Sequence, residues 1–315
     1  MITSKFIPCL IWLLFQTEIT LSNVTSDSVT KHSKGTVTRS WSSVNSGSNP
    51  SEYQFLITGG YRPESNNLAK YVVSIRLVHR YKFFGSNHVC GGAILSEKLI
   101  LTAAHCLLQG TVRLKPQDFE VVAGTPKRLN EVDTTQVMQV KHVRAHSQYE
   151  HLGYDIGLMV LAKKLSYNNA VASIKIPQEE PPAGKQCVAL GWGAIIQFGP
   201  CPNEIVNVDL IVRDRSACAA YGSVFIKGML CVSHSRDDDS DSCEGDSGGP
   251  LICDEKVYGI VSFGSGCGEP QYPGVYTSVY TFLKWINKNW CPPNPVPLPA
   301  IILGLVLLLV IVNQP

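Results

Sequence analysis

The sequence contains no Cys-x-x-Cys pair, although it has 11 cysteines. Metal sites of the zinc-finger kind need such closely spaced pairs, so they are excluded, and we expect no metal or other cofactor. Charge is also scarce, since charged residues make up 17 % of the chain and the formal net charge is +2. This balance predicts neither nucleic acid nor an anionic membrane surface as a partner. The chain also lacks any internal repeat.

Cysteines without metal-site spacing indicate an oxidising compartment with disulfide bonds. The first residues agree, because Lys5 precedes an apolar run at 6–15 and small polar residues follow up to Ser22. Residues 1–22 therefore predict a secretory signal peptide cleaved near Ser22, which removes Cys9 from the mature chain. The apolar run is too short to span a bilayer of ~30 Å.

A second apolar run, Leu298–Val312, follows a proline-rich spacer and has no Lys or Arg after it. It is shorter than the ~20 residues that a spanning helix usually needs. Residues 292–315 therefore predict either a GPI-attachment signal or a short transmembrane anchor, and a tail with neither role stays open. GPI attachment would use one of the asparagines Asn287, Asn289 and Asn294. We expect an extracellular or cell-surface protein, tethered to the plasma membrane through its C-terminus.

Residues 23–56 are rich in Ser and Thr and contain no cysteine, which predicts a flexible pro-segment. Asn23 begins an Asn-Val-Thr sequon and is a candidate glycosylation site. From Ile57 to Cys291, short apolar runs rich in Val, Ile, Tyr and Gly alternate with turn residues. Only Val279–Trp290 has apolar residues at helical spacing. Residues 57–291 therefore predict an all-β domain of two antiparallel β-barrels with a C-terminal helix.

Three residues far apart in this domain have the chemistry of an activated serine. His105 lies in LTAAHC after an apolar strand, Asp155 in GYDIGLMVL before another, and Ser247 in GDSGGP. Taken singly, a His or Asp at a strand end is usually a loop residue or a cap. GDSGGP is more specific, because its glycines permit positive φ and leave the amides of Gly245 and Ser247 free to bind an anion.

The strings ITGG, CGGAIL, LTAAHC, DIGLMVL, ALGWG, GDSGGPL, VSFGSGCG and PGVYTSV together resemble the chymotrypsin (trypsin-like) family of serine proteases over residues 57–291. The resemblance implies that Ser247 is the nucleophile, His105 the general base and then acid, and Asp155 the group that orients His105. It also implies an oxyanion hole formed by the amides of Gly245 and Ser247, with the active site between the two barrels.

The same resemblance assigns a substrate pocket. Asp241, six residues before Ser247, would lie at its base and pair with an Arg or Lys side chain of the substrate. Gly264 and Gly274 would keep the pocket walls open. Ser242 would add a hydroxyl beside Asp241, and Ser262 would line the substrate backbone. The expected partners are protein or peptide substrates with Arg or Lys before the cut, together with protein inhibitors.

The resemblance also implies four disulfide bonds, which are Cys90–Cys106, Cys187–Cys253, Cys218–Cys231 and Cys243–Cys267. Cys201 and Cys291 are left over, and they either pair with each other or remain for an unpaired or intermolecular role. No calcium site is expected in the loop after Gly124, because Thr125 stands where calcium-binding members carry an acid. Asp237–Asp239 lack the ligand spacing of an EF-hand and are expected to be solvated surface.

Members of this family are made as zymogens, and here the new N-terminus would be Ile57, whose ammonium would pair with Asp246. The residue before Ile57 is Leu56, where the family usually has Arg or Lys. An unknown chymotrypsin-like or elastase-like protease would therefore have to activate the chain, or it remains a zymogen. An alternative from another functional class is a non-catalytic, protein-binding member of the protease fold.

Overall fold

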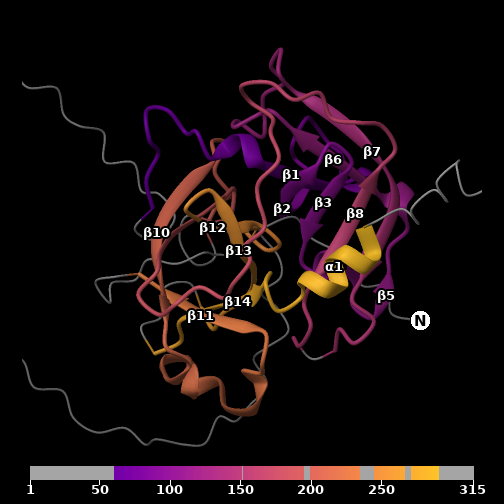
Figure 1. Cartoon of the computed structure of the whole chain (residues 1–315). Coiled ribbons are helices and arrows are strands. Elements are labelled where there is room, and N and C mark those ends of the chain that lie inside the picture. Colours follow the sequence, from indigo (N-terminus) through magenta and orange to yellow (C-terminus); the bar gives the residue numbers. More distant parts are fainter. Residues whose placement is uncertain (1–59, 151, 195–198, 235–244, 267–270, 291–315) are drawn as a thin grey trace, which may run out of the picture.

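The computed structural model describes residues 60–150, 152–194, 199–234, 245–266 and 271–290. These residues form two closed six-stranded antiparallel barrels, which lie side by side in Figure 1. The predicted all-β class is therefore confirmed. The predicted signal peptide, the pro-segment and the C-terminal tail lie outside the described residues. Within the described part, no helix is both long and apolar enough to cross a membrane.

The first barrel has the strand order β1-β2-β3-β8-β7-β6. Its strands are β1 (Val72–Leu77), β2 (His88–Ser96), β3 (Leu99–Thr102), β6 (Phe119–Ala123), β7 (Gln136–Ala145) and β8 (Gly157–Leu161). Two short strands, β4 (Leu108–Gln109) and β5 (Val112–Arg113), form a separate two-stranded sheet. Single 3₁₀ turns occupy Ala69–Tyr71, Val78–Arg80, His105–Leu107 and Pro116–Asp118.

The second barrel has the strand order β10-β11-β14-β13-β12-β9. Its strands are β9 (Gln186–Gly191), β10 (Val206–Arg213), β11 (Met229–Ser233), β12 (Pro250–Cys253), β13 (Lys256–Phe263) and β14 (Gly274–Ser278). An irregular 3₁₀ segment, Arg215–Val224, lies between β10 and β11.

Valine and isoleucine dominate the strands because their branched side chains pack well on a pleated, buried surface. β1 reads VVSIRL and is buried at every position. β7 instead alternates between exposed and buried residues over Val137–Val140, as expected for a strand with one face in solvent. Its alternation is interrupted by a register shift between Val140 and His142, so Lys141 and His142 are both exposed.

The helix α1 (Leu283–Trp290) begins four positions later than the sequence pattern predicts. The amide of Val279 donates to the carbonyl of Tyr258 and so continues the strand pairing beyond β14. Val279 is thus still paired with β13, and turn residues separate it from the start of the helix at Leu283. α1 lies beside the first barrel in Figure 1, where Arg144 of β7 donates to Asn289 at 2.7 Å.

Three of the four expected disulfide bonds are present, namely Cys90–Cys106, Cys187–Cys253 and Cys218–Cys231. The fourth expected pair, Cys243 and Cys267, lies outside the described residues, as does Cys291. A direct bond also joins the two barrels, because the amide of Gly91 in β2 donates to the carbonyl of Ser247 at 2.8 Å. The loop before β12 is thereby held against the first barrel.

Candidate active site

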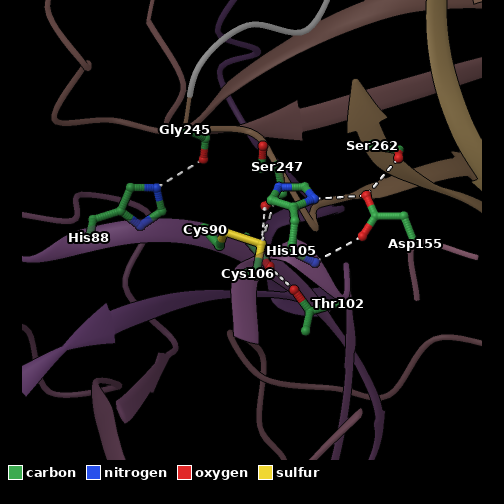
Figure 2. Close-up of a disulfide and its surroundings, with 10 residues drawn as sticks. His88, Cys90, Thr102, His105, Cys106, Asp155, Gly245, Ser247 and Ser262 are labelled. Atoms are coloured by element: carbon green, nitrogen blue, oxygen red, sulfur yellow. Dashed lines mark hydrogen bonds and ion pairs between the residues drawn. A yellow bond between two sulfur atoms is a disulfide. The ribbon is translucent and has the colours of Figure 1, made fainter. Parts of the chain in front are cut away.

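Strand pairing brings His105 and Asp155 together across 50 residues of sequence. β3 and β8 are antiparallel neighbours, with Thr102 opposite Gly157. His105 follows the end of β3 and Asp155 precedes the start of β8, so both lie at the same edge of the barrel. The ring nitrogen Nδ1 of His105 is 2.7 Å from Oδ2 of Asp155, and the His105 amide donates to Oδ1 at 2.9 Å (Figure 2).

Two residues of the second barrel complete the surroundings of Asp155, which is 1 % exposed. The hydroxyl of Ser262 donates to Oδ2 at 2.6 Å, and that of Thr277 donates to the Asp155 carbonyl at 2.8 Å. Burial alone would raise the pKa of Asp155, but the charge of His105 and the hydrogen bonds from His105 and Ser262 outweigh it. The pKa of Asp155 is therefore lowered, and the carboxylate is ionised at neutral pH.

His105 is held in the tautomer that a general base needs. A carboxylate only accepts hydrogen bonds, so Nδ1 of His105 carries the proton and Nε2 is left with its lone pair. Burial lowers the pKa of His105, but the charge of Asp155 and its hydrogen bond outweigh this, and the net shift is upward. The side chain keeps 28 % exposure, so Nε2 can meet a substrate.

Ser247 lies in the tight turn before β12, and Figure 2 shows it beside the ring of His105. Gly248 has φ +77°, and a Cβ there would lie 2.2 Å from the hydroxyl oxygen of Thr102. Gly245 has φ +100°, a conformation that side-chain-bearing residues rarely adopt. The glycines of GDSGGP are therefore required both by the backbone turn and by the close approach of the first barrel.

Asp246 is 3 % exposed, and its Oδ1 accepts the amide of Gly193 at 2.8 Å. A Cβ added to Gly191 or to Gly193 would lie 2.2 or 2.3 Å from its carboxylate oxygens. The string GWG, which begins at the last residue of β9, therefore packs closely against this carboxylate. Ile57, the expected partner of Asp246 after activation, lies outside the described residues.

The expected pocket is described in part. Phe263 of β13 is opposite Val275 of β14, so Gly264 and Gly274 lie at the same end of the two paired strands. A Cβ on Gly264 would meet no atom closer than 3.5 Å, so space remains on this side. Asp241 and Ser242 fall outside the described residues, and so does the sequon at Asn23.

The backbone beside Asp155 has a feature that the sequence did not signal. Leu152 and Tyr154 have φ of 72° and 55°, which is unusual for bulky residues. The ring of Tyr154 stacks on His146 with centroids 5.1 Å apart and packs edge-on against Phe282. These contacts hold the left-handed backbone that leads into Asp155.

One histidine–cysteine group in the described part has its possible ligand atoms within 4.8 Å of one another, formed by Cys90, His105 and Cys106. Metal binding by cysteine requires a thiolate, whereas these two sulfur atoms are joined in a disulfide. The group is therefore explained by the disulfide beside His105.

Comparisons with known proteins agree with this geometry. The family model described as Trypsin matches residues 57–286. The chain is 34 % identical over 238 residues to human Serine protease 1, covering 74 % of this chain and 89 % of that protein. It is 35 % identical to human Trypsin-3, covering 74 % and 72 % respectively.

Among solved structures, mouse neuropsin, a serine protease expressed in the limbic system of the brain, superimposes with a TM-score of 0.62 at 29 % identity. The match covers 71 % of this chain and 95 % of neuropsin. The matched region includes both barrels and the His105–Asp155–Ser247 site. The chain belongs to the trypsin family of serine proteases.

Proposed function

We propose that this protein is a serine endopeptidase that hydrolyses peptide bonds after Arg or Lys. The observation that carries the proposal is the buried, hydrogen-bonded pair of His105 and Asp155, supplied by the first barrel and placed beside Ser247 of the second. A binding protein built on the same fold has no need of an ionised carboxylate that fixes one histidine tautomer.

In the proposed reaction, Nε2 of His105 takes the proton of the Ser247 hydroxyl as its oxygen attacks the scissile carbonyl. The amides of Gly245 and Ser247 stabilise the oxyanion that forms. His105 then protonates the leaving amine. In the second half of the reaction, His105 takes a proton from a water molecule as that water attacks the acyl-enzyme, and then returns the proton to Ser247. Asp155 stays ionised and stabilises the imidazolium, because its pKa is lowered by His105 and Ser262.

The proposed preference for Arg or Lys rests on Asp241, which by the family resemblance would lie at the base of the pocket. It is supported by the space around Gly264, where an added Cβ would meet no atom closer than 3.5 Å, and by the position of Gly274 at the same end of the paired strands. A carboxylate at the bottom of such a slot pairs with a cation that only Arg or Lys can deliver. Ser242 would add a hydroxyl to the same site.

Activation is proposed to occur between Leu56 and Ile57, so that the new ammonium pairs with the buried Asp246. The support is that Asp246 is buried, accepts the amide of Gly193, and packs closely against Gly191 and Gly193. A protein whose pocket prefers Arg or Lys does not cut after Leu56, so another protease with an apolar preference must do so. We further propose a secreted protein, tethered through residues 292–315.

The junction offers a sharp experiment. In the Leu56→Arg variant of the full chain, the junction matches the proposed specificity, and we expect the purified protein to cleave itself and yield Ile57 as the first residue. Self-cleavage should disappear in Leu56→Arg combined with Ser247→Ala, and the wild type should remain intact. N-terminal sequencing and a chromogenic Arg-peptide substrate measure both effects.

A fluorophosphonate probe distinguishes the enzyme from the alternative, a non-catalytic binding protein, because the probe labels only a catalytically active serine. The chain is to be cut at Leu56–Ile57 with an elastase-like protease, and the cut is to be verified by sequencing. Labelling of wild type but not of Ser247→Ala supports the enzyme. An absence of labelling after verified cleavage would refute it.

A further inference from the structure

Arg76 is a buried cation in the core of the first barrel. Its side chain lies on β1 at 0 % exposure, and it forms no ion pair within the part of the chain that the structure describes. Nη1 has no hydrogen-bond partner among those residues. Burial lowers its pKa to about 10; the charge of Glu120 opposes this shift, and the charge of Arg128 adds to it. A buried charge is costly unless its contacts compensate for the lost hydration.

The guanidinium is held by neutral groups. Nη2 of Arg76 donates to the carbonyl of Arg128 at 3.0 Å, and its Cζ lies 4.3 Å from the centre of the Phe84 ring. Arg128 in turn donates to the carbonyls of Gly85, Cys201 and Pro202. The position of Arg76 is therefore fixed from one side, and its Nε donates to another residue of β1, Ser74.

A chain of hydrogen bonds begins at this nitrogen. Nε of Arg76 donates to the hydroxyl oxygen of Ser74 at 3.1 Å, and Ser74 is 2.8 Å from Nδ1 of His88. Nε2 of His88 is 3.1 Å from the carbonyl oxygen of Gly245, a bond visible in Figure 2. The chain thus runs from the core of the first barrel to the loop that carries Ser247.

The donor and the acceptor of each hydrogen bond between Arg76 and Gly245 follow from the chemistry of the groups. A carbonyl only accepts, so Nε2 of His88 must carry a proton and donate to Gly245. Burial and the charges of Arg128 and Arg76 lower the pKa of His88 to about 3, so the ring is neutral and Nδ1 accepts the proton of Ser74. The hydroxyl oxygen of Ser74 is then left to accept from Arg76.

The chain of hydrogen bonds ends at Gly245, whose amide is proposed to bind the oxyanion. Gly245 has φ +100°, and a Cβ there would lie 3.0 Å from the Cα of Gly193. Its carbonyl and its amide belong to two peptide groups that share the Cα of Gly245, so a displacement of the carbonyl that moves this Cα also moves the amide. The bond from His88 opposes that displacement.

We propose that Arg76 is a positioning residue of the oxyanion hole, acting through Ser74 and His88 on the carbonyl of Gly245. Without the donor Nε, Ser74 can turn its proton elsewhere and His88 can adopt its other tautomer, with Nδ1 protonated. The bare Nε2 lone pair would then face the Gly245 carbonyl and repel it. This inference rests on the proposed function, because it concerns the same reaction.

The test compares Arg76→Met, Ser74→Ala and the double variant, each in the full chain cut at Leu56–Ile57. Arg113→Met on β5, an exposed arginine, is the matched control. Removing an oxyanion donor typically lowers kcat ~10²–10³-fold, so a misdirected donor should lower it about 10- to 100-fold, with KM changed less than about threefold. Since both side chains act through His88, the double variant should fall within about threefold of the more severe single variant.

Two inhibitors separate positioning from general damage. A peptidyl-arginine aldehyde forms an adduct whose oxyanion enters the hole, whereas benzamidine fills only the pocket. We expect the variants to bind the aldehyde about 10-fold or more weakly and benzamidine within about twofold of wild type. Equal weakening of both inhibitors would indicate a purely structural role and overturn the inference.

The remaining outcomes are also decisive. If Arg76→Met does not fold, Ser74→Ala alone carries the test, because it removes one buried hydroxyl and leaves the guanidinium in place. Unchanged kcat in the folded variants of an active enzyme overturns this inference and leaves the proposed function intact. A wild type that neither labels with fluorophosphonate nor hydrolyses Arg peptides overturns both.

Discussion

Replacing Ser262 by alanine removes one of the three hydrogen bonds that the described residues donate to the carboxylate of Asp155. The bond is 2.6 Å long, both residues are buried, and the acceptor is charged. Hydrogen bonds to charged groups contribute about 1.5–3 kcal/mol. For a domain of this size each kcal/mol corresponds to about 2–4 °C, so we expect the melting temperature of Ser262→Ala to fall by about 3–12 °C.

The same change should move the titration of His105. In the wild type, Asp155 shares its charge between His105 and Ser262. Without Ser262, more of that charge acts on His105, so the pKa of its imidazole should rise. One pKa unit corresponds to about 1.4 kcal/mol, so transfer of about half of the hydrogen-bond energy gives an upward shift of up to about one unit.

The assay is the pH dependence of kcat/KM, together with thermal melting at pH 6–8. Melting belongs in this range because the lowered pKa of Asp155 gives a stabilisation that is present above about pH 4 and is lost as pH falls. Ser278→Ala is the matched control, since Ser278 on β14 also donates to a carboxylate, that of Glu180, at 2.8 Å. The control should lose stability without moving the midpoint. An unchanged or lowered midpoint in Ser262→Ala would refute the reasoning.

Two further predictions concern the proposed reaction. The kcat/KM of the activated wild type should rise with pH through a midpoint above about 6.5, because the base must be neutral and the pKa of His105 is raised; a midpoint below that value would contradict the geometry of the His105–Asp155 pair. Asp241→Ser should lower kcat/KM for Arg and Lys peptides by about 30- to 5000-fold, as expected when a buried charge pair worth about 2–5 kcal/mol is lost. If kcat/KM falls less than about threefold on peptides that differ only in the residue before the cut, Asp241 does not lie in the pocket.

Much of the fold and the site could be predicted from local strings. GDSGGP, LTAAHC and DIGLMVL carry the residues of the candidate active site. The turn that holds Ser247 requires glycine at Gly245 and Gly248, because both have positive φ. Three disulfide pairs followed from the family resemblance, and they are present. The sequence pattern predicted the start of the terminal helix at the wrong residue. The hydrogen bond from Val279 to Tyr258 is a tertiary contact, and the spacing of apolar residues gives no information about it.

By itself, the sequence determined the barrel class, the family and the identity of the candidate residues, since each depends on spacing within a few residues. Only the tertiary structure decided which distant groups meet. The pairing of β3 with β8 brings His105 to Asp155, and the second barrel adds Ser262 and Thr277. The bonds that link Arg76 to Gly245 likewise join segments far apart in the chain. Such contacts depend on strand register and barrel packing, which fix positions that no local string encodes.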